Sequence, residues 1–201
     1  MYEKNIIREG YSLTPIIRIT LFLALAVCWL FLHGQFVYAA DIASGTSGTC
    51  SWVIDEDGTL TIRPTDGVSG TLESQTMNEF SWYSNRTSVK KVVIEPGVKT
   101  AAGCYKMFSE FAYCTEMDLR ELDTSGTTDM SFMFRGCSRL TSLDVSGFDT
   151  GNVTNMNSMF RGCSSLTSLD VSSFNTEKVT LMTSMFYDLQ SIKSLDLSQC
   201  H

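Results

Sequence analysis

"MFRGCSRLTSLDVSGFDTGNVTNMNS" spans residues 133–158, and residues 159–184 repeat it as "MFRGCSSLTSLDVSSFNTEKVTLMTS". Nineteen of the 26 aligned positions are identical, and the seven residues that differ are polar or small in the first copy. Met-Phe pairs that begin at residues 107, 133, 159 and 185 carry the same period through the C-terminal half. A period of ~20–29 residues is typical of a solenoid whose coils each supply one short strand. We therefore predict a stack of 26-residue coils.

Each copy contains a stretch in which apolar and polar residues alternate, as in a half-buried strand. In "LTSLDVS", Leu143 and Val145 face one side and Asp144 and Ser146 face the other. We predict one short parallel strand per coil at this place, with the strands ~4.8 Å apart. A single coil cannot bury its own apolar face, so the apolar positions recur while the polar ones vary.

The segment 1–39 has the pattern of a secretory signal peptide. Basic residues precede twelve uninterrupted apolar residues, Leu21 to Leu32, and small residues follow them. A membrane-spanning helix needs ~20 apolar residues. The segment is therefore short for a permanent anchor and is typical of a signal helix that is cleaved, here after Ala39. An uncleaved anchor remains the alternative, and it would be the chain's contact with a membrane.

Between the signal segment and the repeats we expect a small β-rich module. The stretch "CSWVIDEDGTLTI", residues 50–62, alternates on both sides of Asp57-Gly58, which is a hairpin signal. The Gly/Ser/Thr-rich residues 41–49 are interpreted as a flexible leader. Val89 to Ile94 is a further predicted strand, and Phe80, Trp82 and Tyr83 are predicted core anchors.

These patterns together predict a β-rich repeat solenoid with three segments. They are a signal peptide at 1–39, a β-rich module at 40–87, and a solenoid at 88–201 with coils starting near 107, 133, 159 and 185. The last coil is incomplete and would place Leu195, Leu197 and Cys200 on an open flank. Solenoids need a polar cap at each end. We therefore expect the isolated chain to be marginally stable, to dimerise end to end, or to continue in its natural context.

Six cysteines follow residue 39, and none belongs to a C-x-x-C pair of the kind that binds zinc. One position of the coil is occupied in turn by Cys114, Cys137, Cys163 and Leu189. A position that accepts either Cys or Leu is apolar. We therefore predict buried thiols that act as small hydrophobic groups rather than as disulfides or metal ligands. A disulfide between Cys50 and Cys104 is left open.

The charge and the histidine count argue against several classes of function. The formal net charge is −7, and removal of residues 1–39, with three basic and two acidic residues, makes it −8. An acidic surface repels nucleic-acid phosphates and disfavours polybasic membrane binding. One histidine lies in the signal segment and the other is His201, the last residue. We therefore expect no catalytic triad, no metal site and no cofactor.

The candidate binding residues form a strip along the outward face of the predicted sheet. Each coil supplies one aspartate and two serines: Asp144, Asp170, Asp196, Ser142, Ser168, Ser194, Ser146, Ser172 and Ser198. An acidic, hydroxyl-rich strip suits a basic patch on a partner protein, or a cation. The alternative is a solvated face whose charges keep an exposed sheet soluble.

Several sequence motifs occur together in the order that is typical of one family. "MFRGCSSLTSLDVSSFNT" after "VTNMNS", with "GTCSWVIDEDGTLTI" and "WYSNRTSVKKVVIEPGVKT" upstream, resembles the BspA-like leucine-rich repeat surface proteins of bacteria. The resemblance covers roughly residues 45–201. It implies export or attachment to a bacterial cell surface, and adhesion to host or bacterial surface proteins. The few repeats, without a C-terminal cap or sorting motif, depart from the long members of that family.

From the sequence we therefore expect a secreted or cell-surface protein that mediates protein–protein or cell-surface adhesion and is not an enzyme. A structural spacer, or an N-terminal fragment of a longer surface protein without a ligand of its own, is the alternative. A hydrolase that uses paired carboxylates is a third hypothesis, but a regular ladder lacks the unique pocket of an active site.

Overall fold

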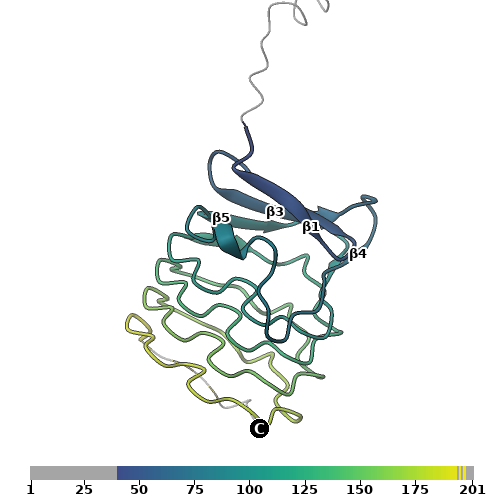
Figure 1. Ribbon diagram of the computed structural model, residues 1–201. Helices are drawn as coiled ribbons and strands as arrows, with labels where there is room; N and C mark the ends of the chain where they lie inside the picture. The colour runs from purple at the N-terminus through teal and green to yellow at the C-terminus, as the bar shows by residue number, and fades with distance from the viewer. Residues whose placement is uncertain (1–39, 194, 196, 198–201) are drawn as a thin grey trace, which may run out of the picture. The chain divides into compact units, whose positions relative to one another are not determined.

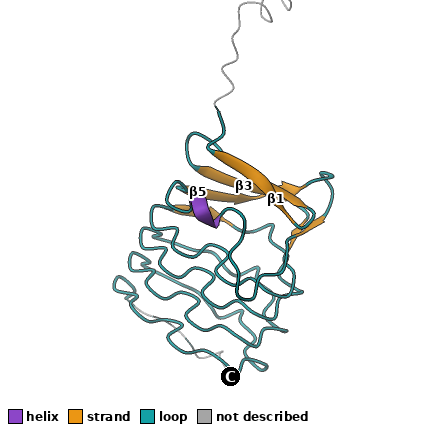
Figure 2. Ribbon diagram, viewed as in Figure 1, coloured by secondary structure: helices purple, strands orange, loops and turns teal. Residues whose placement is uncertain are grey.

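The computed structural model describes residues 40–193, 195 and 197. All of them belong to one compact unit, which is β-rich and has no α-helix among the described residues. A single 3-10 turn, η1 (Tyr83–Asn85), interrupts the loops (Figure 2). The predicted signal segment, and the strip residues Ser194, Asp196 and Ser198, lie outside the described residues.

A five-stranded sheet forms the N-terminal end of this unit (Figure 1). Its strands, in spatial order, are β1 (Ala43–Ser47), β2 (Cys50–Ile54), β3 (Thr59–Pro64), β5 (Lys91–Ile94) and β7 (Glu116–Asp118). The pairs β1–β2 and β2–β3 are antiparallel, whereas β3–β5 and β5–β7 are parallel. Two short strands, β4 (Gly70–Thr71) and β6 (Val98–Lys99), pair separately. The sheet thus runs from the N-terminal hairpin into the first coil.

The hairpin predicted around Asp57-Gly58 is confirmed. Strand β2 buries Cys50, Trp52 and Ile54, and β3 pairs with it in antiparallel register. Gly58 has a φ of 85°, and a Cβ atom there would lie 2.5 Å from the carbonyl oxygen of Ser88. The turn therefore needs glycine both for its backbone conformation and for space.

The prediction of a flexible leader at residues 41–49 is wrong, because most of that segment forms β1. Gly45 pairs with Trp52 across the ladder, and its missing side chain leaves room for the indole. An added Cβ would come within 2.8 Å of the Trp52 ring. The glycine therefore marks a close contact with an aromatic side chain and not a flexible linker.

Trp82 attaches the N-terminal module to the first coil. Its ring is fully buried, stacks on Phe80 at 4.7 Å and meets Trp52 edge-on at 6.3 Å. Its Nε1 donates a 2.8 Å hydrogen bond to the carbonyl oxygen of Met107. Phe80 and Trp82 are thus core anchors, as predicted, whereas Tyr83 is only half-buried.

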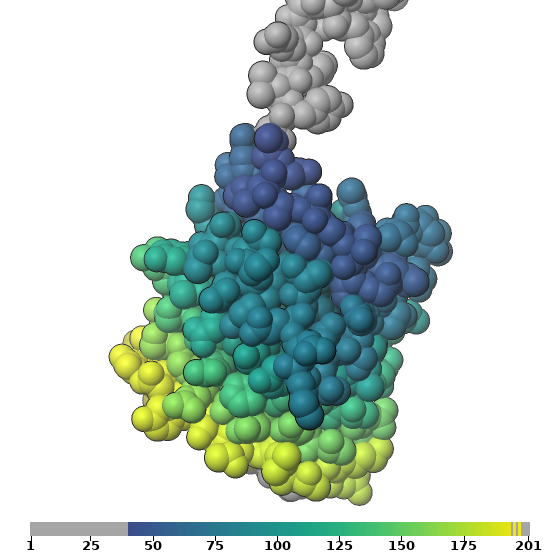
Figure 3. Space-filling view, in the orientation of Figure 1, coloured from purple at the N-terminus to yellow at the C-terminus, as the bar shows by residue number. Residues whose placement is uncertain are grey.

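Successive 26-residue coils lie on one another in chain order, as the bands of colour in Figures 1 and 3 show. Single parallel bridges join Gly103 to Asp129, Asp129 to Asn155, and Asn155 to Leu181. Each bridge links equivalent positions of two successive repeats. The described part of the chain therefore places copies of one sequence position side by side in neighbouring coils.

A regular set of hydrogen bonds between coils comes from four turn segments, defined here as residues 104–110, 130–136, 156–162 and 182–188. Every second N–H in the first three donates to a carbonyl of the next coil, such as Phe134 N to Met159 O at 2.9 Å. Each turn segment has two residues at positive φ, and both positions recur once per repeat: Lys106, Phe132, Ser158 and Ser184, and Glu110, Gly136, Gly162 and Asp188. These segments are consecutive turns rather than strands.

A column of phenylalanine rings runs through the coils, as the repeat predicts. The Phe108 and Phe134 ring centroids are 5.8 Å apart, those of Phe134 and Phe160 are 5.7 Å apart, and those of Phe160 and Phe186 are 6.0 Å apart. The first three rings are fully buried and the last is half-buried. Each ring therefore packs on its own copy, which explains why this position does not vary.

The prediction of one strand per coil at "LTSLDVS" is correct for the first coil and wrong for the next two. The equivalent residues of the first coil form β7, but residues 142–146 and 168–172 contain no strand. The predicted facing is nevertheless confirmed, because Leu143 and Val145 are buried and Asp144 is exposed. The Asp144 carboxylate accepts bonds from the N–H and hydroxyl of Ser146, so this segment ends in a local turn.

The five cysteines among the described residues are buried free thiols, as predicted for the repeat positions. Cys114, Cys137 and Cys163 have no exposed surface, and Cys50 and Cys104 are also unpaired. The Cys163 thiol donates to the Phe134 carbonyl at 3.1 Å, and Cys137 makes the same contact to Phe108. A short side chain with a weak donor therefore fits the space between two phenylalanines.

We expect these thiols to react with a thiol reagent such as DTNB only after unfolding. Burial raises the pKa of Cys104 to about 12 and that of Cys114 to about 11, and it also raises the pKa of Cys137. At pH 8 these three thiols are then almost entirely protonated, whereas the thiolate is the reactive species. Labelling should follow global unfolding in a urea series. Rapid labelling of Cys137 or Cys163 in the folded protein would contradict this burial.

Candidate binding groove

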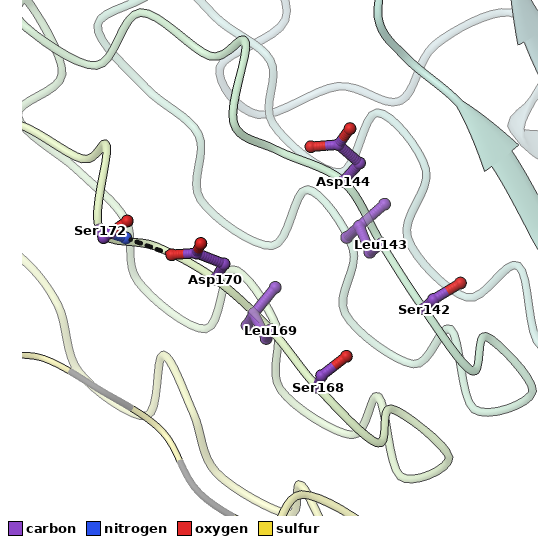
Figure 4. Close-up of a pocket in the computed structure, with 7 residues that line it drawn as sticks. All are labelled: Ser142, Leu143, Asp144, Ser168, Leu169, Asp170 and Ser172. Atoms are coloured by element: carbon purple, nitrogen blue, oxygen red, sulfur yellow. Dashed lines mark hydrogen bonds between the residues drawn. The ribbon is translucent and has the colours of Figure 1, made fainter.

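A shallow groove lies between two extended segments, 142–144 and 168–170, which run side by side in neighbouring coils (Figure 4). Its volume is about 580 Å³. The lining residues are Ser142, Leu143, Asp144, Ser168, Leu169, Asp170 and Ser172. We call this the strip groove, because most of these residues belong to the predicted strip.

The strip groove exists because the two segments are not joined by a hydrogen-bond ladder. Their one flanking backbone bond is Thr167 N to Thr141 O, at 3.1 Å. Within the described residues, the peptide groups of 142–144 and 168–170 have no protein partner. Leu143 and Leu169 form the floor and are 7% and 6% exposed. The groove thus combines an apolar floor with open backbone donors and acceptors.

Two carboxylates stand at the rim of the strip groove. Asp144 and Asp170 are exposed, and each accepts a hydrogen bond from the N–H two residues later, at 3.0 and 2.9 Å. Bonds from the Ser146 and Ser172 side chains, and then from their N–H groups, hold the pKa of both carboxyls below the usual value. The charge of Asp170 acts in the opposite direction on Asp144. The negative charges are therefore fixed in place and close enough to repel.

The structure extends the acidic row by one residue that the sequence prediction missed. Asp118 lies in β7, one repeat before Asp144, and so occupies the same place in the coil. The signal was present in "MDL" (117–119), which aligns with "LDV" (143–145) once the register of the repeat is kept. Arg120 pairs with Asp118 at 2.7 Å and adds a positive charge at this end.

Two of the four strip serines that the structure describes have a local role. Ser142 and Ser168 line the groove without a hydrogen bond of their own, whereas Ser146 bonds to Asp144. Ser172 does both, since its N–H is held by Asp170 and the residue lines the groove. The structure thus brings two coils of the predicted strip together.

We predict that Arg120→Gln raises the pKa of Asp118 from about 2 towards the ordinary ~3.9. The hydrogen bond from Arg120 is the largest cause of the low value. A lowered carboxyl pKa stabilises the fold above the unfolded-state value, and the contribution is lost as the pH falls from ~3.9 to about 2. An NMR titration of the Asp118 carboxyl carbon measures the shift. Arg63→Gln, on exposed β3 surface, is the control and should leave Asp118 unchanged.

A metal-ligand cluster, an unsatisfied buried polar side chain and a membrane-spanning helix are all absent from the described residues. No group of three or more His, Cys, Asp or Glu side chains is placed to hold a metal ion in this part of the chain. Every buried side-chain nitrogen and oxygen that the structure describes has a hydrogen-bond partner. Among the same residues, no helix has the length and apolar character needed to cross a membrane.

Two comparisons with known proteins give a similarity, one to a protein family and one to a solved structure. Residues 102–200 match a family described as "Mycoplasma protein of unknown function, DUF285". The solved structures include a leucine-rich repeat protein from Eubacterium ventriosum with 17% sequence identity and a TM-score of 0.40. That similarity covers 77% of this chain and 43% of the Eubacterium ventriosum chain. This chain therefore spans less than half the length of the Eubacterium ventriosum protein. No curated protein matches the chain.

Proposed function

We propose that the protein is an exported leucine-rich repeat protein of a bacterial surface that binds other proteins and has no catalytic activity. The stacked coils support the solenoid assignment, and the signal pattern of residues 1–39 supports export. Adhesion to a host or bacterial surface protein is the role we assign to it. The observation that carries the proposal is the strip groove with its regular row of exposed carboxylates.

The strip groove suits a basic segment of a partner protein. Asp144 and Asp170 repeat at one side of the coils, and a partner with lysines or arginines would neutralise their mutual repulsion. The open peptide groups between 142–144 and 168–170 offer backbone hydrogen bonds to an extended chain. A basic, extended segment therefore matches both the charge and the hydrogen-bonding groups of the groove.

The test is binding of a lysine-rich peptide to the double variant Asp144→Asn/Asp170→Asn. Asparagine keeps the side-chain oxygen that accepts from Ser146 and Ser172, so the local turns are preserved. Exposed ion pairs contribute ~0.2–1 kcal/mol each, so we expect a loss of about 2- to 30-fold in affinity. Binding of the original protein should weaken with salt.

The matched control is Glu56→Gln/Asp57→Asn, which removes the same charge from the exposed hairpin turn. Equal losses in both variants would show general electrostatic attraction and would overturn the strip groove as the site. Pull-downs from cell-surface and extracellular-matrix extracts with residues 40–201 then test the adhesive role. An original protein that retains nothing in either assay would support the structural-spacer alternative.

A further inference from the structure

The N–H groups at alternate positions of the turn segments donate in one direction along the stack, towards the next coil. Each junction, meaning the contact between two successive coils at the turn segments, has four N–H groups of one turn segment that donate to four carbonyls of the next coil. In the second junction the donors are Met130, Phe132, Phe134 and Gly136, and the acceptors are Asn155, Asn157, Met159 and Arg161. The turn segments thus present N–H groups towards the C-terminal end of the stack and carbonyls towards the N-terminal end.

The last turn segment, 182–188, has no following coil among the described residues. There, the N–H groups of Met182, Ser184, Phe186 and Asp188 have no partner within the described structure. Their equivalents in the three preceding turn segments are all bonded to the next coil. This segment therefore displays four donors with the spacing of a coil-to-coil junction.

Apolar side chains surround these donors. Leu181 is 53% exposed, Met182 37% and Tyr187 61%, although Met130 and Met156, the equivalents of Met182, are fully buried. Phe186 and Leu189 are half-buried where Phe160 and Cys163 have no exposed surface. We call residues 181–189 the C-terminal flank. It has the apolar groups and the backbone groups of a junction that lacks its other half.

The opposite end of the stack is already covered. Gln75 N donates to the carbonyl of Gly103 at 2.9 Å, and Trp82 Nε1 donates to that of Met107. A second copy of the chain therefore has two of the four carbonyls at this end already bonded and cannot offer a complete junction to the C-terminal flank. Two C-terminal flanks facing each other would oppose donors with donors, which forms no hydrogen bonds and leaves them buried and unpaired. The end-to-end dimer, one of the three alternatives that follow from the sequence, is thus disfavoured in both orientations.

We propose that the C-terminal flank binds a further coil of the same 26-residue type, which presents its backbone carbonyls to the four free N–H groups. Positions equivalent to Asn155, Asn157, Met159 and Arg161 would supply four carbonyls in register. A Phe at the position of Phe160 would stack on Phe186, as those two rings already do on the other side. The interface continues the three junctions present in the chain and is independent of the strip groove.

The test tethers the partner coil to the chain by inserting a second copy of residues 159–184 directly after Ser184. Tethering gives the added coil a high effective concentration. We expect hydrogen exchange at Met182 and Ser184 to slow by about tenfold or more, towards the rates of Met156 and Ser158, because their N–H groups gain carbonyl partners. The control inserts the same copy with Asp in place of its Met-Phe pair, which should give no protection.

Two results would overturn the proposal. Protection at Met156 and Ser158 reports that an insertion variant has folded. If those amides are protected while Met182 and Ser184 exchange as fast as in the original chain, the C-terminal flank does not accept a coil. The second result is a dimer of the original chain, detected by sedimentation equilibrium, in which hydrogen exchange at Met182 and Ser184 is slowed. Such a dimer would show that a second copy is the occupant.

Discussion

Replacing Phe160 by alanine is expected to lower the free energy of unfolding by about 3–5 kcal/mol. The ring lies between Phe134 and Phe186 in the column, and Phe174 contacts it from the side at 6.4 Å. It is fully buried, so truncation loses its burial and leaves a cavity between two coils. The parallel contacts with Phe134 and Phe186 add ~0.5–1.5 kcal/mol each beyond burial.

Urea unfolding followed by circular dichroism measures this effect. Phe186→Ala is the matched control, because it removes the same ring from a half-buried position with one stacking neighbour. We expect the control to lose less than half as much stability. Equal losses at the two positions would mean that stacking on both sides contributes nothing, and the account of why the repeat keeps its phenylalanines would fail.

The second large effect is expected for Thr150→Val, at about 1–3 kcal/mol. The hydroxyl of Thr150 donates to the carbonyl of Asn175 at 3.1 Å and accepts from its N–H at 2.8 Å. Thr124 makes the same pair of bonds to Asp149, one coil earlier. Valine preserves the shape of this buried side chain but leaves both backbone groups of Asn175 without their partner.

Thr167→Val is the control for this substitution. Its hydroxyl also bonds to the preceding coil, to Thr141 O at 3.2 Å, but both residues are exposed and water can replace the bond. Surface changes of this kind usually stay within ~0.5 kcal/mol. If both valine variants have the same stability as the original in urea, the buried threonines do not join the coils.

The repeat pattern contained a signal for the buried threonines, as it did for Asp118, but neither was predicted from the sequence. Thr150 and Thr176 are identical in the two copies, whereas their neighbours Asp149 and Asn175 differ. A polar residue that is retained between varying positions indicates a specific hydrogen bond. The partner could not be predicted, because it is a backbone group of the next coil and depends on the register of the stack.

The strand prediction failed for a related reason. Alternation in "LTSLDVS" correctly separates buried Leu143 and Val145 from exposed Asp144, since burial alternates in any extended segment. Whether neighbouring extended segments form a ladder depends on their separation. That separation is governed by the turn segments and by local bonds such as Ser146 N to Asp144 Oδ1.

The length of the repeat, the side of each extended segment that is buried, and the apolar nature of the cysteine sites all follow from the order of amino acids. They depend on hydrophobicity and repetition, which are properties of the chain itself. The positive-φ turns at Phe132 and Ser158, the Trp82 bond to Met107, and the groove between Leu143 and Leu169 emerge only in the folded state. Each of them depends on how far apart two coils lie, and that distance results from packing all the side chains at once.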